Sequence, residues 1–177
     1  MKSIFIIVFT ILSLPLFSQS ITSISLTASG LTCSMCSKAI YKSLLKLPTV
    51  EKVDADIQNS GFTIFLKPGS KIVLGDFRKA VQDAGFSVAS LQIKANFTHS
   101  VIDPHSELSI EGNRVVFPGV EKQELNGPRT LLLIDKGYLP EKDRRKYDHL
   151  LPGNVGGEPG AGGGNSGNVY HAVIQQS

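Results

Sequence analysis

The order of strand-like and helix-like segments between Thr22 and Lys94 constrains the fold of this chain more than any other feature. Residues 22–28 alternate apolar side chains with Ser and Thr, a pattern typical of a half-buried strand. Residues 37–47 then place three apolar side chains at helical spacing, and these are Ile40, Leu44 and Leu47. Pro48 ends this predicted helix, because proline disfavours helical geometry in the residue before it.

The next part of the same stretch predicts a hairpin, a second helix and a last strand. Residues 50–58 and 62–66 flank a turn at Asn59-Ser60-Gly61 and predict the hairpin. Residues 73–84 predict the helix, with Gly85 as its left-handed cap. Residues 88–93 predict the strand. The order βαββαβ is the ferredoxin-like pattern, an α+β fold in which two helices cover one face of a four-stranded sheet.

Both cysteines of the chain lie in the run Gly30-Leu31-Thr32-Cys33-Ser34-Met35-Cys36, between the first predicted strand and the first predicted helix. Cys33 is expected in the loop and Cys36 in the first turn of the helix. The unpaired amides and the positive dipole end of a helix start favour a thiolate there. Two thiols at this spacing can bind one soft metal ion or form a disulfide. Without a histidine or carboxylate between them they suit Cu(I) or Hg(II), whereas zinc takes four ligands.

Residues 22–94 resemble a heavy-metal-associated domain, the module of copper chaperones, of metal-pumping P-type ATPases and of the periplasmic mercury-binding protein. The family motif Gly-Met-Thr-Cys-x-x-Cys lies between the first strand and the first helix. The run here has Leu31 where the family usually has Met, a mild change at a packing position. The positions that match are Gly30, Thr32, Cys33 and Cys36. A second family element closes the second helix as Asp83-Ala84-Gly85-Phe86.

The resemblance implies that Cys33 and Cys36 are the metal ligands and that Phe86 shields the metal loop. It favours Cu(I) over Hg(II), because copper-handling members are commoner. The implied function is capture of the ion and its transfer to a partner, which would be a metal-transporting ATPase, an efflux component or a copper enzyme. Such a carrier is not an enzyme. Thiols on two copies can also bridge one ion, which would give a metal-bridged dimer.

Two other functions fit the same residues. The cysteine pair could serve a periplasmic thiol–disulfide redox protein, since adjacent thiols outside the cytoplasm tend to be oxidised. The chain could also be an interaction protein whose C-terminal domain binds a partner. A thioredoxin-type enzyme is disfavoured because the chain has no tryptophan. Haem attachment is disfavoured because Ser37, and not histidine, follows Cys36.

Residues 1–18 predict a signal peptide, with Lys2 at its positive end and an apolar stretch over residues 4–17 that is too short to span a bilayer. We therefore expect an exported protein that is not membrane-embedded, in a bacterial periplasm. The formal net charge of +3 is too small and too scattered to indicate a nucleic-acid partner.

The rest of the chain predicts a linker over residues 95–104 and a small, mostly β domain over residues 105–177. Its expected elements are strands at 107–110, 114–117, 130–134 and 169–174, a short charged helix at 139–150, and a glycine-rich loop at 153–168.

The remaining metal-ligand types in the sequence are weak candidates for a second site. His99, Asp103 and His105 lie close in sequence, but nothing fixes their geometry, and surface side chains near a linker are the favoured interpretation. His149 and His171 are isolated in the sequence. Met35 lies between the cysteines, and we expect it to contact a partner and not the metal.

Overall fold

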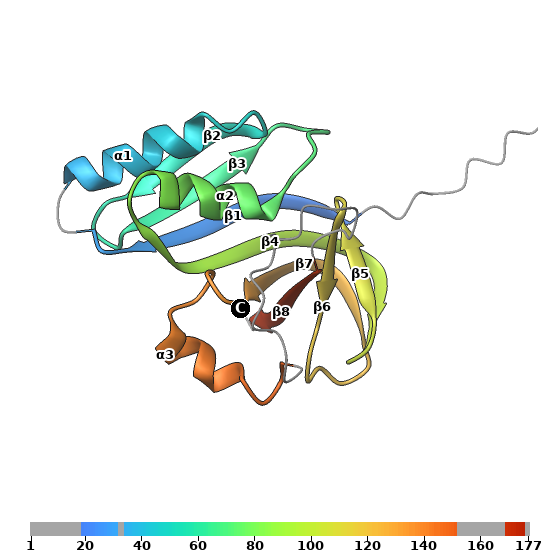
Figure 1. The fold of residues 1–177 in the computed structure, drawn as a ribbon. Helices are drawn as coiled ribbons and strands as arrows, with labels where there is room; N and C mark the ends of the chain where they lie inside the picture. Colours follow the sequence, from blue (N-terminus) through green and yellow to red (C-terminus); the bar gives the residue numbers. More distant parts are fainter. Residues whose placement is uncertain (1–18, 32–33, 152–168, 176–177) are drawn as a thin grey trace, which may run out of the picture.

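The computed structural model describes residues 19–31, 34–151 and 169–175, and eight strands in these residues form one mixed sheet. The strand order is β2-β3-β1-β4-β7-β8-β6-β5 (Figure 1). The strands are β1 (Ser20–Ser29), β2 (Val50–Asp56), β3 (Gly61–Leu66), β4 (Ser87–Ile102), β5 (Glu107–Ile110), β6 (Asn113–Val116), β7 (Gln123–Leu133) and β8 (Val169–Gln175). The helices are α1 (Ser34–Leu45), α2 (Leu74–Asp83) and α3 (Glu141–Arg144), which continues as a 3-10 turn, η1 (Arg145–Tyr147). The predicted signal peptide and glycine-rich loop lie outside the described residues.

The first half of the chain has the predicted ferredoxin-like arrangement. β1 pairs antiparallel with both β3 and β4, and β2 pairs with β3. Helices α1 and α2 cover the same face of these strands (Figure 1). The apolar side chains that alternate along the strands and recur along the helices are buried between the two layers, as the sequence predicts. They include Ile24, Leu26, Ile40, Leu44, Ile64, Leu74, Phe77 and Val81.

The hairpin between β2 and β3 corrects one expectation. β2 ends at Asp56, so Ile57 belongs to the turn and is 57% exposed instead of buried. Asn59 donates to the Asp56 carboxylate from its side chain and from its backbone, at 2.7 and 3.2 Å. These hydrogen bonds, the side-chain one foremost, lower the pKa of Asp56. The turn thus begins one residue before the expected end of the alternating pattern.

The predicted linker over residues 95–104 is wrong, because β4 continues to Ile102 and pairs with β7. A β-bulge interrupts the ladder. Phe97 is opposite Gly127 and Ser100 is opposite Leu125, so two residues of β4 face one of β7. His99 has a φ of 45°, in the left-handed region. The extra residue shifts the alternation of buried and exposed side chains by one position. The sequence pattern of this part of β4 therefore does not predict a strand.

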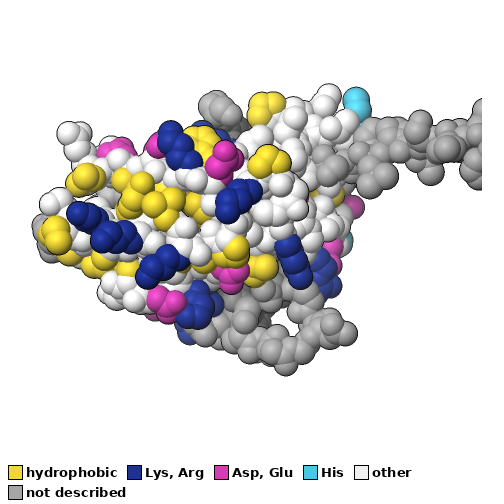
Figure 2. Space-filling model, turned by 90° about the horizontal axis from the view of Figure 1, so that it is seen from above, with side chains coloured by type: hydrophobic (Ala, Val, Ile, Leu, Met, Phe, Trp, Pro, Cys, Tyr) yellow, Lys and Arg dark blue, Asp and Glu magenta, His cyan; other side chains and the backbone are white. Residues whose placement is uncertain are grey.

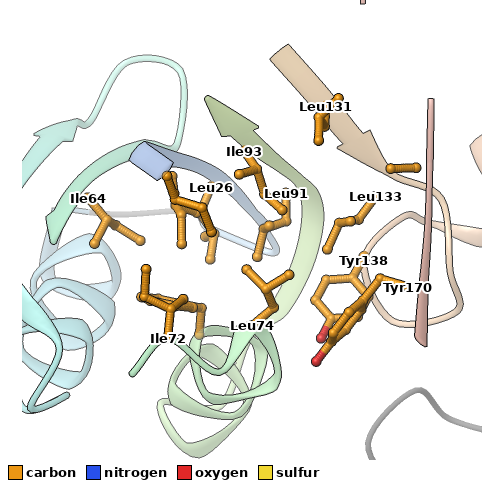
Figure 3. Packing of buried hydrophobic residues seen from close by; sticks show 14 of the residues in the cluster. Leu26, Ile64, Ile72, Leu74, Leu91, Ile93, Leu131, Leu133, Tyr138 and Tyr170 are labelled. Atoms are coloured by element: carbon orange, nitrogen blue, oxygen red, sulfur yellow. The ribbon is translucent and has the colours of Figure 1, made fainter. Parts of the chain in front are cut away.

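The expected separate C-terminal domain is also corrected, since its strands extend the sheet of the first half. β7 pairs antiparallel with β4, and β8 pairs antiparallel with β7 and parallel with β6. One cluster of buried hydrophobic side chains runs from Ile21 to Ala172. Figure 3 shows Leu91 and Ile93 of β4 across from Leu131 and Leu133 of β7. The two halves therefore share one sheet and one core.

Asn113 of β6 ties the C-terminal half to the start of α2. Its side chain is buried, its Nδ2 donates to the carbonyl of Ile72 at 3.0 Å, and its Oδ1 accepts from the amide of Leu74 at 3.4 Å. The first amides of a helix have no partner within the helix. A residue from the second half of the chain thus satisfies a backbone group of a helix in the first half.

Two buried tyrosines reinforce this connection. The rings of Tyr138 and Tyr170 meet edge to face, with centroids 5.9 Å apart and planes at 81° (Figure 3). The guanidinium of Arg78 on α2 lies 5.6 Å from the centre of the Tyr138 ring, within cation–π range. The loop after β7 and the start of β8 therefore both pack on α2.

Tyr138 makes the stability of the fold sensitive to high pH. Burial, followed by the neighbouring Tyr170, raises the pKa of Tyr138 above its ordinary value of 10.0. Above that pH the unfolded chain loses a proton that the folded chain keeps, so the stability from this group is complete below it and declines as pH rises. We expect the free energy of unfolding in urea to fall between pH about 9 and about 11. Tyr138→Phe should show a shallower fall, and equal slopes would contradict the assignment.

The predicted helix over residues 139–150 is shorter than expected. α3 has four residues, and the 3-10 turn η1 follows it directly. Exposed ion pairs link its side chains, Arg145 with Glu141 at 3.1 Å and Lys146 with Asp143 at 3.0 Å. Neither α3 nor η1 has a buried residue, so no apolar face stabilises a longer helix. None of the described helices combines the length and apolar character that crossing a membrane requires.

Candidate metal centre

The connection between β1 and α1 holds the cysteine motif at one end of the sheet. β1 ends at Ser29, and Gly30 follows with a φ of 84°, which favours glycine. A Cβ on Gly30 would lie 4.0 Å from Cδ1 of Phe86. Thr32 and Cys33 lie outside the described residues, and α1 begins at Ser34. The loop that carries the first cysteine is therefore bounded by Leu31 and Ser34.

Cys36 is the third residue of α1 and is partly exposed, so the prediction that it lies in the first turn of a helix is confirmed. It stands four residues before Ile40 and eight before Leu44, both of which are fully buried. Residues at this spacing share one face of a helix. Packing of Ile40 and Leu44 on the sheet thus fixes Cys36 at the loop end of the buried face. Met35, by contrast, is 70% exposed.

The second family element lies beside the same loop. Gly85 has a φ of 89° and its amide donates to the carbonyl of Gln82 at 2.8 Å, which ends α2. The amide of Phe86 donates to the carbonyl of Val81 at 3.1 Å. This turn brings the Phe86 ring to Gly30. Phe86, the aromatic residue of the second family element, therefore lies against the start of the cysteine loop.

The solvent side of α1 is basic. Lys38 and Lys42 lie on α1 and Lys46 follows its end, while α1 itself contains no Asp or Glu. Figure 2 shows the face seen from above, where basic side chains lie beside hydrophobic ones. A partner that approaches this side of α1 therefore meets positive charge, and Lys38 is the basic residue of the helix nearest the cysteine loop.

The other candidate ligands do not come together. His99 Nδ1 contacts Glu124 Oε1, and the Asp103 carboxylate accepts from the backbone amide of His105 at 2.8 Å. His149 is exposed. Within the described ranges, no three His, Cys, Asp or Glu side chains are grouped so that they could hold a metal ion. The interpretation of these histidines as ordinary surface side chains is therefore favoured for His99, His105 and His149.

His171 is different, and sequence reasoning missed its partner. It is buried on β8, and its Nδ1 lies 2.8 Å from Oδ1 of the buried Asp135. Oδ2 of the same carboxylate accepts from the His171 backbone amide at 2.7 Å. The two residues are 36 positions apart. No local pattern could pair them, because only the alignment of β7 with β8 brings them together.

Replacing Asp135 with asparagine should destabilise the fold by about 1–3 kcal/mol. Asparagine keeps one acceptor oxygen where the carboxylate has two, so one of the two His171 groups would be buried without an acceptor. The measurement is the free energy of unfolding in urea. Asp148→Asn is the matched control, since the Asp148 carboxylate pairs with Arg144 at the surface, at 2.7 Å. Equal effects of the two substitutions would contradict the structural role of Asp135.

Comparison with known proteins locates the family resemblance in the first half of the sheet. Residues 25–87 match the sequence model of the heavy-metal-associated domain. We find no curated protein whose sequence matches the chain.

Three similar solved structures each match a little over a third of the chain. The oxidized MerP from Ralstonia metallidurans CH34 is 25% identical, with 41% of this chain and 96% of that chain covered and a TM-score of 0.36. The yeast copper transporter domain CCC2A is 23% identical, with coverages of 37% and 89% and a TM-score of 0.34. The apo-CopP of Helicobacter pylori is 18% identical, with coverages of 38% and 100% and a TM-score of 0.33. The family resemblance rests on residues 25–87, which match the heavy-metal-associated domain.

Proposed function

We propose that this protein is an exported carrier that captures one soft metal ion through Cys33 and Cys36 and passes it to a partner. The observation that carries the proposal is the position of Cys36, partly exposed in the first turn of α1 of a heavy-metal-associated domain. Cys33 lies three residues earlier in the sequence, a spacing at which two thiols can bind one soft ion.

The cargo we propose is Cu(I), with Hg(II) as the second choice. Both ions accept two thiolates at low coordination number. Zinc would need further ligands, and no group of three potential ligands occurs in the described part of the chain. Handover needs only that the cysteines of a partner replace Cys33 and Cys36 one at a time. No bond of an organic substrate is made or broken, so the proposed role is that of a carrier and not of an enzyme.

The proposed setting is the bacterial periplasm, on the basis of the leader-like residues 1–18. The proposed partner is a metal-transporting ATPase, an efflux component or a copper enzyme. The basic solvent side of α1 supports docking of such a partner, since Lys38 lies near the loop end of the helix and Lys42 follows one turn later.

A competitive titration of the reduced protein, residues 19–177, tests the proposal. Cu(I), Ag(I), Hg(II) and Zn(II) are each titrated against a chromogenic chelator, with the Cys33→Ser/Cys36→Ser variant as control. We expect one-to-one Cu(I) binding that the variant lacks, and weak Zn(II) binding. Binding of the wild type no tighter than that of the variant would overturn the carrier function. A reduction potential in the range of disulfide exchange proteins would then favour the redox alternative.

A further inference from the structure

Strand β8 has a neighbour on both sides for only part of its length. On one side it pairs with β7 from Ala172 to Gln175. On the other side it pairs with β6 only from Val169 to His171. β6 ends at Val116, and the chain then turns away. Among the described residues, no strand therefore lies beside residues 172–175 on the β6 side.

The direction of the backbone groups in this free edge follows from one hydrogen bond. The amide of Ile134 donates to the carbonyl of His171 at 3.0 Å across the β7–β8 pair. Backbone groups of an antiparallel ladder alternate in direction along a strand. Val173 and Gln175 therefore direct their backbone N–H and C=O groups towards β7, as His171 does. Ile174 directs its N–H and C=O away from β7, to the side that β6 has left.

A groove lies along this edge. Its volume is about 490 Å³, and its lining includes residues 172–175 and residues 117–120 of the β6–β7 connection. Val120, Leu150 and Ile174 are partly exposed and supply apolar surface. The wall is closely packed at Gly119, where a Cβ would lie only 2.4 Å from Cδ2 of Leu150. The groove thus combines unpaired main-chain groups with an apolar lining.

The charge of the groove is positive. Arg129 is its only ionisable lining residue in the described part of the chain, and its Nη1 donates to the carbonyl of Pro128 at 2.9 Å. Gln123 and Gln175 add amide groups that can donate or accept hydrogen bonds. A ligand that complements this lining carries a carboxylate near Arg129.

We propose that this groove binds an extended segment of a partner polypeptide, which adds to the sheet as a strand beside Ala172–Gln175. Four residues of such a strand span about 13 Å, and an added strand lies about 4.8 Å from its neighbour. Main-chain hydrogen bonds to Ile174 would supply affinity, and alternate side chains would enter the apolar lining. The segment would carry apolar residues at alternate positions and one Asp or Glu for Arg129.

Two other occupants fit less well. The β6–β7 connection forms the wall opposite the free edge, and this wall hinders the approach of the sheet edge of a second copy. The glycine-rich residues 152–168 contain Val155 as their only branched aliphatic residue, which makes them a poor match for the apolar lining. This inference does not depend on the proposed metal transfer, since Leu31, Ser34 and Cys36, the described residues around the cysteine loop, do not line the groove.

A displayed library of eight-residue peptides tests the proposal against residues 19–177. We expect the selected peptides to alternate apolar and polar residues and to contain Asp or Glu. Resynthesised peptides should bind at least about tenfold more weakly to Ile174→Pro, which removes the free N–H without removing a β7 hydrogen bond. Arg129→Glu should weaken binding by a similar factor, because it reverses the charge that Arg129 places in the groove. N-methylation of alternate peptide amides should abolish binding.

Control variants separate this site from the others. Ile174→Val keeps the free N–H, and Arg145→Glu changes an exposed charge outside the groove. Both variants should bind the peptides with an affinity within about twofold of that of the wild type.

Failure to select any peptide, or peptides that bind Ile174→Pro and Arg129→Glu as tightly as the wild type, would overturn the proposal. A dimer that Ile174→Pro abolishes would assign the groove to a second copy. Loss of peptide binding in Cys33→Ser/Cys36→Ser would assign the peptides to the cysteine loop.

Discussion

Replacing Cys36 alone with serine should weaken Cu(I) binding by at least about 10³-fold, which corresponds to about 4 kcal/mol. A serine hydroxyl is a hard, neutral donor at neutral pH and does not replace a thiolate for a soft ion. Cys36 is the cysteine whose position the structure describes, on the sheet-facing line of α1 with Ile40 and Leu44. Cys36 is only partly buried, and the substitution leaves Ile40 and Leu44 unchanged. The helix and its packing on the sheet should therefore stay in place. The measurement is competition for Cu(I) with a chelator of known affinity.

Met35 provides the matched control, because it lies in the same turn of α1 and is 70% exposed. Met35→Leu removes the thioether and keeps similar bulk. We expect its Cu(I) affinity to stay within about threefold of the wild type. A loss comparable to that of Cys36→Ser would make Met35 a ligand and would change the proposed coordination. Retention of full affinity by Cys36→Ser would exclude the cysteine pair as the binding site.

Replacing Tyr170 with alanine should destabilise the whole protein by about 3–5 kcal/mol. Tyr170 is fully buried, packs edge to face on Tyr138, and lies close to Gly75 of α2. Its removal leaves a cavity between β8 and α2, where the two halves of the chain meet. Since the halves share one core, we expect a single unfolding transition in urea, shifted to lower denaturant. Amide exchange in β1 and β3 should rise together with exchange in β7.

Tyr147→Ala is the control for this substitution. Tyr147 is only partly buried and packs against a separate small cluster of Leu132, Ile134 and Leu139. Its loss should cost less than that of Tyr170. If Tyr170→Ala changed amide exchange only in β7 and β8, while β1 and β3 kept their protection, the two halves would be independent domains and the shared core would be refuted.

The elements of the first half could be predicted because their signals are local. Leu74, Phe77 and Val81 repeat at helical spacing and all face the sheet. The glycine at the end of α2 marks its cap directly. The cysteine motif is equally local, since seven consecutive residues hold both thiols and the start of the helix. Periodicity and capping therefore determine this part of the fold from neighbouring residues alone.

The C-terminal half could not be predicted in the same way, because its structure depends on distant pairings. The bulge at His99 shifts the alternation of buried and exposed side chains along β4, so the sequence pattern predicts a linker there and not a strand. The parallel pairing of β6 with β8 joins residues such as Val115 and Tyr170 that are far apart in sequence. The contact between Asp135 and His171 depends on the β7–β8 register. None of these partners lies within a window in which periodicity can be recognised.

The position of β8 within the sheet has a consequence for folding. The last strand that the structure describes, β8, begins inside the sheet and not at its edge, because residues 169–171 lie between β7 and β6. Until residues 169–175 have left the ribosome, β6 and β7 each expose an unpaired edge, and Tyr138 lacks the aromatic ring on which it packs. Formation of the native sheet must therefore await the synthesis of residues 169–175. Pairings of such long sequence separation also slow folding.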